Sequence, residues 1–281
     1  SGQMGQFVPA DWRGRLIVDL VDVDSAKFEA YAQRLGPLRG FIHAREGRLL
    51  RKVEAALAAR ATHTVLVSAE EAALLRARVG AVGDIRALGN GIDCARFDPK
   101  PVEPEPQLAR TSGPHLVFTG QMDYPPNVAA VKRCARDILP AIRQRHPDAR
   151  FHIVGRAPTP AVRKLAAMAG VTVWGAVADM RPFLAAADMV IAPLTIARGV
   201  QNKVLEAMAM ARPVLASPEA ATGIGAVPGE HLLVCESNRA FIEQALDLIA
   251  FPERGRLLGR AARQHVCERM SWPAMLAPLP A

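Results

Sequence analysis

Residues 189–216 read MVIAPLTIARGVQNKVLEAMAMARPVLA, and this stretch decides the fold. Its first four residues form an apolar run that predicts a buried strand, and apolar periodicity then predicts a helix from about Gln201. The pair Arg212-Pro213 ends this helix because proline cannot continue it. The apolar residues 214–216 read as a second short strand. A strand, a helix and a further strand in this order predict a β-α-β unit of an α/β sheet.

The start of the predicted helix is suited to binding an anion. A helix N-terminus presents backbone N–H groups and the positive end of the helix dipole, and phosphate commonly binds there. Lys203 adds a positive charge in the first turn, and Glu206 follows three residues later on the same side. A carboxylate there suits the paired hydroxyls of a ribose. The residues leave open an alternative, an ordinary β-α-β unit with an ion pair on its helix.

Strand and helix patterns alternate along most of the 281 residues, which predicts α/β architecture with parallel sheets and crossover helices. In the first part we expect strands at 15–21, 64–68 and 85–91, and helices at 25–33 (capped by Ser25), 45–60 and 69–79. In the second part we expect strands at 116–120, 150–155, 171–175, 189–192, 214–216 and 232–234, and helices at 126–145, 160–169, 180–187, from 201, 238–250 and 253–269.

The segment 98–114 is polar and rich in proline, which is typical of a linker between domains. We therefore expect a partial N-terminal domain at 1–100, a linker at 101–113, a C-terminal Rossmann-like domain at 114–270 and a tail at 271–281. Too few strands precede the linker for a complete Rossmann-like half. The chain also begins with Ser instead of Met, so we expect the beginning of the first domain to lie outside it.

Composition narrows the classes of partner. Hydrophobic residues make up 50% and charged residues 22%, as in globular proteins with a real core. Aromatic residues make up only 5%, which disfavours binding of single-stranded nucleic acid by stacking. The net charge of +8 suits a phosphorylated substrate or an anionic membrane, and without a dense Lys/Arg block we expect no nucleic-acid partner. The basic amphipathic helix at 45–60 could lie on a membrane surface or pack on the first domain.

The cysteines and histidines carry no metal-site pattern. Cys94, Cys134, Cys235 and Cys267 are scattered without a C-x-x-C pair, and we expect four free thiols in a reducing cytoplasm. The histidines lack ligand spacing, so we expect them to be structural or surface groups. No signal peptide and no run of 18 or more apolar residues occurs.

The run RGVQNKVLEAMAMARPV resembles the donor-site motif of the group 1 glycosyltransferases, glycosyltransferase family 4. Its form is most similar to the branch linked to bacterial exopolysaccharide and exosortase systems. The family pattern is a Glu, seven residues, and a second Glu followed by Ala-Met-Ala. Glu206 matches the second Glu, and the resemblance implies that it holds the ribose. Arg198 stands at the place of the first Glu, which contacts the transferred sugar in the family, and its fork suits a diphosphate or a sugar carboxylate.

The resemblance covers about 116–249, and more loosely 15–99, where 87–93 is similar to the family's passage out of the first domain. Gly120 and Gln121 open a loop that borders the donor phosphates in the family, and Gln121 stands near a family Arg. Arg156 could supply the missing charge, and Val177 stands where the family backbone receives the base. The alternatives are a simple β-α turn at Gly120 and a solvated Arg156.

Three carboxylates, Asp19, Asp22 and Asp24, stand at the end of the first predicted strand. They suit a metal site or acidic caps for the following helix. The resemblance places Asp22 where many family members carry a His that faces the donor sugar, and so implies a catalytic role for Asp22.

Taken together, the resemblance implies the B-type glycosyltransferase fold, two Rossmann-like domains. It implies a retaining hexosyltransferase-type enzyme (EC 2.4) that moves a sugar from a nucleotide-sugar donor to a glycan or lipid-linked acceptor in bacterial exopolysaccharide or cell-envelope glycan synthesis. We expect no metal cofactor, and a place in the cytoplasm or at the inner face of the membrane. The implied donor-binding residues are Gly120, Gln121, Arg156, Val177, Arg198, Gly199, Val200, Gln201, Asn202, Lys203 and Glu206.

Two other functions stay open on the sequence. One is a non-catalytic nucleotide-sugar binding protein, which the absence of the first Glu and of the loop Arg and Lys favours. The other is a nucleotide-sugar epimerase of the same fold, which would need a different acid/base set. A chain that lacks part of its first domain could also bind nucleotide without turnover.

Overall fold

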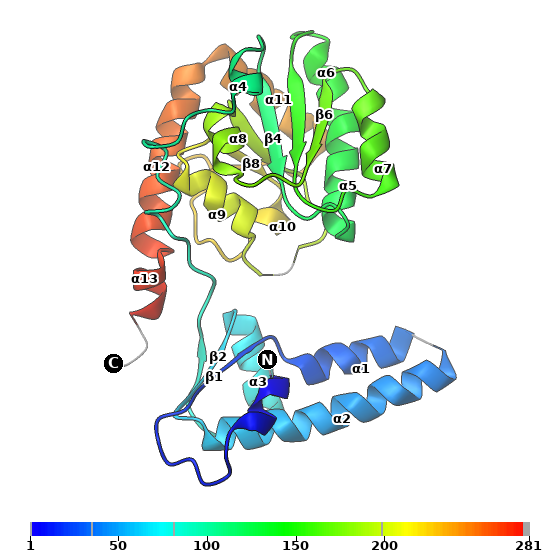
Figure 1. Ribbon diagram of the computed structural model, residues 1–281, viewed down its shortest axis with the longest axis vertical. Coiled ribbons are helices and arrows are strands. Elements are labelled where there is room, and N and C mark those ends of the chain that lie inside the picture. The colour runs from blue at the N-terminus through cyan, green and yellow to red at the C-terminus, as the bar shows by residue number, and fades with distance from the viewer. Residues whose placement is uncertain (1, 35, 81, 198, 278–281) are drawn as a thin grey trace. The chain divides into compact units, whose positions relative to one another are not determined.

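The computed structural model describes residues 2–34, 36–80, 82–197 and 199–277 (Figure 1). The chain folds into two compact units, Ser1–Gly89 and Asn90–Ala281. The division thus lies before the linker expected at 101–113. In that segment Leu108 is buried in the core of the second unit, and the N–H of Glu105 donates to the carbonyl of Pro182 at 2.9 Å. The expected roles of the two domains stay predictions.

The first unit contains a parallel three-stranded sheet in the order β1-β2-β3. Its elements are a 3-10 helix at Gly2–Phe7, β1 at Ile17–Val21, α1 at Asp24–Arg34, α2 at Pro37–Arg60, β2 at His63–Leu66, α3 at Ala69–Val79 and β3 at Ile85–Ala87. Helix α2 begins earlier than expected, at a proline whose fixed φ suits the first helical turn. Helix α1 packs along α2, and a small apolar core forms around Leu20, Leu57, Leu66 and Leu75.

The loop between β1 and α1 is held by two carboxylates from other helices. Ser25 was expected to cap α1, but the helix already begins at Asp24. The backbone N–H of Ser25 and its hydroxyl both donate to the buried carboxylate of Glu54 on α2. The N–H of Val23 donates to Glu71 of α3 at 2.8 Å. The cap prediction failed because a carboxylate from elsewhere in the chain competes for these donors.

The second unit is a doubly wound α/β sheet of six parallel strands in the order β6-β5-β4-β7-β8-β9. Counted along the chain, this is the 3-2-1-4-5-6 order of the Rossmann fold. The strands are β4 His115–Thr119, β5 Arg150–Val154, β6 Val171–Gly175, β7 Met189–Ala192, β8 Val214–Ala216 and β9 Leu233–Val234. Strands β4, β5, β7 and β8 are almost wholly buried because helices cover both faces of the sheet, whereas most of the edge strand β6 is half-buried.

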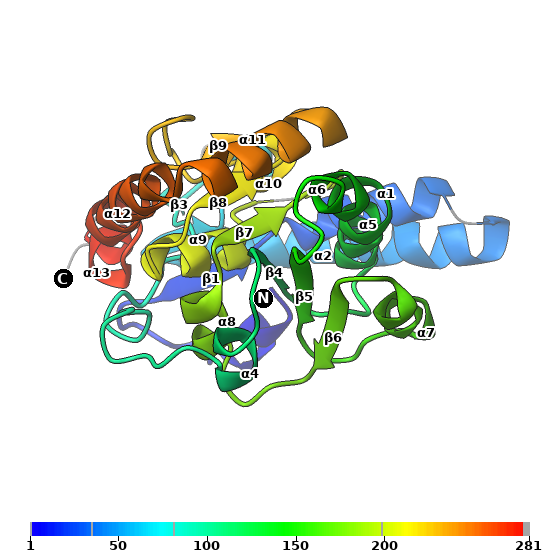
Figure 2. The ribbon, with the colours of Figure 1, turned by 90° about the horizontal axis from the view of Figure 1, so that it is seen from above.

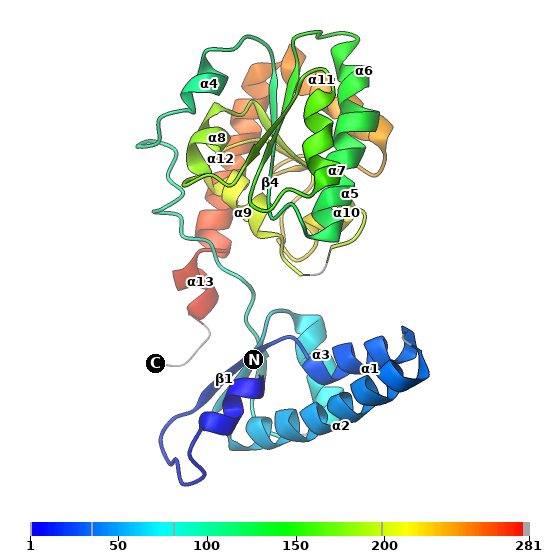
Figure 3. The same ribbon diagram turned by 45° about the vertical axis from the view of Figure 1, so that its right-hand side comes forward.

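Helices α5, α6 and α7 lie on one face of this sheet, and α8, α9 and α12 lie on the other (Figure 2). Helix α9 packs against α12 (Figure 3). The helical elements are α4 Pro106–Ala109, α5 Pro125–Arg133, a π-helical turn at Cys134–Ile138, α6 Leu139–Arg143, α7 Pro160–Arg163, a 3-10 turn at Lys164–Ala167, α8 Arg181–Ala186, α9 Asn202–Ala209, α10 Pro218–Ala221, α11 Asn238–Ala250, α12 Pro252–Arg269 and α13 Trp272–Leu276. None of the described helices is long and apolar enough to cross a membrane.

The helix expected at 126–145 is interrupted by the π-helical turn. Pro140 lacks an N–H and crowds the preceding turn, and the wider turn ends just before it, with the N–H of Leu139 donating to the carbonyl of Cys134. Helix α13 lies in the segment expected to be a tail. An isolated β-bridge between Ile92 and Ser271 brings its beginning to the start of the second unit.

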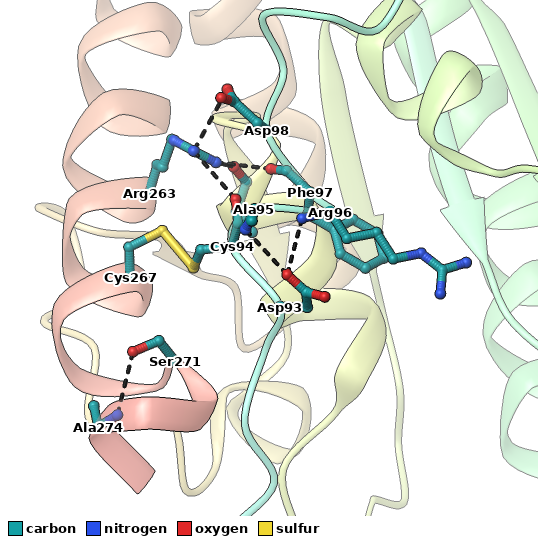
Figure 4. The surroundings of a disulfide bond; sticks show 11 residues. Asp93, Cys94, Ala95, Arg96, Phe97, Asp98, Arg263, Cys267, Ser271 and Ala274 are labelled. Atoms are coloured by element: carbon teal, nitrogen blue, oxygen red, sulfur yellow. Dashed lines mark hydrogen bonds and ion pairs between the residues drawn. A yellow bond between two sulfur atoms is a disulfide. The ribbon is translucent and has the colours of Figure 1, made fainter. Parts of the chain in front are cut away.

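The prediction of four free thiols is wrong for Cys94 and Cys267, which form a disulfide with their Cα atoms 5.8 Å apart (Figure 4). The two residues are 173 positions apart in the sequence, so no local spacing indicated the pair. Helix α12 carries Cys267 to the segment that follows β3. Arg263, one turn earlier on α12, donates to the carbonyls of Phe97 and Cys94. Cys134 and Cys235 are free and buried.

Two histidines lie inside the sheet of the second unit, as structural groups. The indole N–H of Trp174 donates to Nδ1 of His152 at 3.2 Å, and Nε2 of His152 lies 2.9 Å from Nδ1 of His115. Nε2 of His115 lies 3.2 Å from the carbonyl of Thr111. These three contacts satisfy the hydrogen-bonding nitrogens of both rings when each ring carries its proton on Nε2. Burial lowers the pKa of His152 to about 3, so the ring is neutral at ordinary pH.

Candidate functional site

A cavity of about 580 Å³ opens in the second unit at the carboxyl ends of β4 and β5 and beside the start of α9. Strands β4 and β7 are neighbours whose crossover connections leave toward opposite faces of the sheet, and ligands bind at this kind of switch point. The volume lies in the range of small-molecule sites. The lining residues are Thr119, Gly120, Gln121, Asn127, Val154, Gly155, Arg156, Ala176, Val177, Met180, Val200, Gln201, Asn202, Lys203 and Glu206.

Two glycines shape the floor of the cavity. Gly120 and Gly155 follow β4 and β5 directly and have φ values of +154° and +153°. A Cβ atom placed on Gly155 would lie 1.6 Å from the carbonyl oxygen of Gly120. The two strand ends can therefore approach each other only because Gly155 lacks a side chain.

Helix α9 is positioned by its apolar face. Val204, Leu205, Ala207 and Met208 are fully buried against the sheet and α12. The side chain of the helix N-cap, Gln201, does not cap a backbone N–H of the first turn, and its Oε1 accepts from Nζ of Lys203 instead. The first-turn N–H groups therefore keep the capacity to bind an anion from the cavity.

Lys203 and Glu206 project from α9 into the cavity. Lys203 Nζ lies 3.4 Å from Oε1 of Gln201 and 5.5 Å from the ring centroid of Phe118. Burial lowers the pKa of Lys203 to about 8, against the effect of Glu206. Burial raises the pKa of Glu206 to about 7, against the effects of Lys203 and Arg96. The cavity therefore holds two groups that change charge near neutral pH, a common property of functional sites.

The opposite wall carries a weaker pair. Arg156 Nη2 donates to Oε1 of Gln121 at 2.8 Å, and both side chains are exposed. The backbone also joins these two loops, since the N–H of Met122 donates to the carbonyl of Arg156 at 2.8 Å. Arg156 thus brings a positive charge to the Gln121 loop. In the family, an Arg of that loop itself supplies such a charge, and here Gln121 stands near its position.

Most of the predicted donor residues lie around this one cavity. Those that line it are Gly120, Gln121, Arg156, Val177, Val200, Gln201, Asn202, Lys203 and Glu206. Gly199 is described, with φ +60°, but does not line it. Arg198 lies outside the described residues. Asp22 is exposed and belongs to the first unit. That these residues bind a donor stays a prediction.

Sequence reasoning missed Thr119 and Asn127, both of which are buried in the wall. The predicted set also leaves out Val154, Gly155, Ala176 and Met180, which line the cavity. The signal was available for Thr119, which ends an apolar strand just before Gly120 at the edge where ligands bind. In the sequence Asn127 looks like an ordinary residue in the first turn of a helix, and only the structure shows that its side chain is buried and donates to the carbonyl of Gln121.

The three carboxylates around the end of β1, which are Asp19 in the strand, Asp22 after it and Asp24 at the start of α1, do not gather into a site. Within the described ranges, no group of three His, Cys, Asp or Glu side chains could hold a metal ion. Asp19 accepts from the N–H of Val21 at 3.0 Å, and Asp24 lies 4.0 Å from Lys27. Asp22 follows the strand in the exposed loop.

The part of the chain that forms the cavity is similar to a known protein family. Residues 113–250 match the family model described as glycosyl transferases group 1. Over this segment the chain is similar to that family, and the segment includes the strand ends, α9 and all residues that line the cavity. A search of curated proteins finds no match.

Solved structures share the fold of the whole chain. Sucrose-phosphate synthase from Thermosynechococcus elongatus is 19% identical with a TM-score of 0.65, covering 98% of this chain and 69% of its own. Anabaena Alr3699/HepE, in complex with UDP and glucose, is 15% identical with a TM-score of 0.64, covering 94% and 69%. WaaG, a glycosyltransferase involved in lipopolysaccharide biosynthesis, is 16% identical with a TM-score of 0.65, covering 99% and 80%. The chain therefore has the B-type glycosyltransferase fold that the sequence predicted.

Proposed function

We propose that this chain binds a nucleotide-sugar in the cavity at the ends of β4 and β5 and transfers the sugar to a glycan or lipid-linked acceptor. We further propose that transfer retains the anomeric configuration and serves bacterial exopolysaccharide or cell-envelope glycan synthesis. One observation carries the proposal. The segment that matches the group 1 glycosyltransferase model holds a helix N-terminus, a half-buried lysine and a half-buried carboxylate in one cavity at the topological switch point.

Each group has a part that its chemistry allows. The first turn of α9 and Lys203 bind the diphosphate and stabilise the negative charge that grows on it as the sugar leaves. Glu206, one turn later, accepts hydrogen bonds from the ribose hydroxyls. Val177 and its neighbours receive the base. Arg156 supplies a second cation, so the chain's own groups replace a metal ion in stabilising the leaving group. Asp22 is the candidate catalytic residue that acts on the transferred sugar.

Two solved structures with the same fold lend support. HepE has been seen with UDP and glucose and also with UDP-glucose. These ligands consist of the parts that the cavity here would receive, a nucleoside diphosphate and a hexose.

The test is calorimetric titration of the 281-residue chain with UDP, GDP and ADP, with and without EDTA. We expect one nucleotide to bind equally well in both buffers. The substitution Glu206→Ala should weaken that binding by about 1–3 kcal/mol, because ribose hydroxyls lose their buried partner. Glu219→Ala, at an exposed glutamate in the second unit, is the matched control and should bind as the wild type does. Failure of all three nucleotides to bind would overturn the proposal.

A non-catalytic nucleotide-sugar binding protein is the second candidate, because Gln121 brings no charge to the phosphate loop. Release of nucleoside diphosphate from the bound nucleotide-sugar, in the presence of acceptor glycans, separates the two. Tight binding without release would favour the second candidate.

We also propose that α2 contacts an anionic membrane at its inner face. Phe41 and Leu49 are 64% and 42% exposed, and Arg45, Arg48 and Lys52 are exposed on the same stretch of helix. Apolar and basic side chains together suit the interfacial region of an anionic bilayer. The chain should sediment with vesicles that contain phosphatidylglycerol and less so after Arg45→Glu/Arg48→Glu. Equal recovery of both proteins in the supernatant would exclude this contact.

A further inference from the structure

Two buried polar atoms in the wall of the cavity have no hydrogen-bond partner among the residues that the structure describes. They are Oγ1 of Thr119 and Oδ1 of Asn127, in residues that are 1% and 4% exposed. Buried polar groups in native proteins are nearly always hydrogen-bonded, because an unpaired one loses its contacts with water and gains nothing. Because both residues line the cavity, a ligand bound there would supply a partner for these atoms.

The orientation of the Asn127 amide determines whether this partner donates or accepts a hydrogen bond. Its Nδ2 donates to the backbone carbonyl of Gln121 at 2.9 Å. A carbonyl oxygen can only accept, so the amide nitrogen must face it and the amide oxygen must face the other way. The free atom of Asn127 is thus an acceptor, and it needs a ligand group that donates a hydrogen bond.

An ionised diphosphate cannot be that group, since its oxygens only accept. A hydroxyl can donate to Asn127 Oδ1. A hydroxyl can also pair with Thr119 Oγ1, which both donates and accepts. The chemistry of this part of the wall therefore matches a sugar.

The position of Asn127 selects one of the two sugars in a nucleotide-sugar. A Cβ atom placed on Gly120 would meet Nδ2 of Asn127 at 2.8 Å and Cε of Lys203 at 3.3 Å, so these two side chains lie on the same side of Gly120. Lys203 is the proposed diphosphate group, and Glu206, one turn along α9, already serves the ribose. The other hydroxyl-bearing group attached to a diphosphate is the transferred sugar.

We propose that Thr119 and Asn127 bind a hydroxyl of the transferred sugar and act as specificity-determining residues of the donor site. This inference rests on the proposed function. It predicts that the two residues distinguish the nucleotide-sugar from the nucleoside diphosphate alone, whereas Glu206 does not.

The test uses Thr119→Val, which removes the hydroxyl but keeps the size and β-branched shape of the side chain in β4. Thr64→Val is a matched control, because Thr64 is also a buried strand threonine whose Oγ1 has no partner in the described part of the chain, but it lies in β2. Asn127→Ala is the second variant, and melting temperatures show whether each protein is folded. The ligands are UDP, GDP and ADP, and UDP-glucose, GDP-mannose and ADP-glucose, titrated by calorimetry.

We expect Thr119→Val and Asn127→Ala each to weaken binding of the nucleotide-sugar about tenfold and to change binding of the matching nucleoside diphosphate less than twofold. Thr64→Val should change neither. If Asn127→Ala unfolds because the carbonyl of Gln121 loses its donor, Thr119→Val decides alone.

Other outcomes overturn the inference in separable ways. Equal losses for both ligands would assign the contact to the nucleotide and leave the proposed function standing. Unchanged affinity for both ligands would mean that water satisfies the two atoms, and would reject the sugar contact alone. Absence of binding by the wild type to all six ligands would reject the proposed function and this inference together.

Discussion

At the scale of single residues, the cavity contains two side chains whose pKa values burial has moved close to neutral pH. Lys203 and Glu206 are three residues apart on α9, but Lys203 Nζ has the side chain of Gln201 as its hydrogen-bond partner. Burial disfavours the charged form of both groups and so moves their pKa values toward each other, to about 8 and about 7. An incoming nucleotide would restore the lost stabilisation, with a diphosphate for the lysine and hydroxyl donors for the carboxylate.

These pKa values predict a narrow pH range for nucleotide binding. Glu206 accepts hydrogen bonds as a carboxylate, which predominates above about pH 7, and Lys203 attracts phosphate as an ammonium, which predominates below about pH 8. Affinity should therefore be highest between these values and fall by up to tenfold for each pH unit outside them. Titration calorimetry from pH 5.5 to 9.5 measures the profile.

The variant Glu206→Gln separates the two limbs of this profile. Glutamine does not titrate, so the decrease on the acidic side should disappear while the decrease on the basic side stays. Glu219→Gln should keep both limbs. An affinity that is level from pH 6 to 9 in the wild type would show that these two groups do not govern binding.

At the scale of elements, the site depends on how closely the ends of β4 and β5 approach. The N–H of Gly120 donates to the carbonyl of Val154 at 3.0 Å, and the N–H of Gly155 donates to that of Gly175 at 2.9 Å. These contacts continue the sheet ladder to its edge and set the position of both loops that line the cavity. The glycines thus determine the floor of the site as much as the side chains determine its chemistry.

We predict that Gly155→Ala destabilises the second unit by at least about 2 kcal/mol and weakens nucleotide binding. The new Cβ would lie 1.6 Å from the carbonyl oxygen of Gly120, and backbone cannot yield as a flexible side chain does. Gly36→Ala is the control, because Gly36 has φ −60° and open space around it, and we expect a cost within about 1 kcal/mol. Urea unfolding measures both. A stability for Gly155→Ala equal to that of the control would show that the strand ends separate easily.

At the scale of the whole molecule, the disulfide ties the beginning of the second unit to its end. Cys94 follows the division between the units, and Cys267 lies on the last long helix (Figure 4). The segment that carries Cys94 also carries Arg96, whose charge lowers the pKa of Glu206. The bond therefore holds a segment that acts on the site electrostatically.

We predict that the double variant Cys94→Ala/Cys267→Ala is less stable than the oxidised wild type by about 2–5 kcal/mol, because the cross-link restricts the unfolded chain over 173 residues. Urea unfolding with and without reductant measures this. Reductant should lower the stability of the wild type and leave that of the variant unchanged. Thiol counting on the unfolded, unreduced wild type should find two free thiols, those of Cys134 and Cys235; four would show that the bond does not form.

The amino-acid sequence by itself determined the α/β class, the strands of the Rossmann-like half and the motif around Glu206. These depend on apolar periodicity, turn residues and short spacings, which are local properties of a chain. Only the tertiary structure decided the partner of Cys94, the capture of Ser25 by Glu54, and the burial of Thr119 and Asn127 beside Lys203. Each of these features joins residues that are far apart in the sequence. Local sequence patterns do not specify which distant atoms compete for the same donor or line the same cavity.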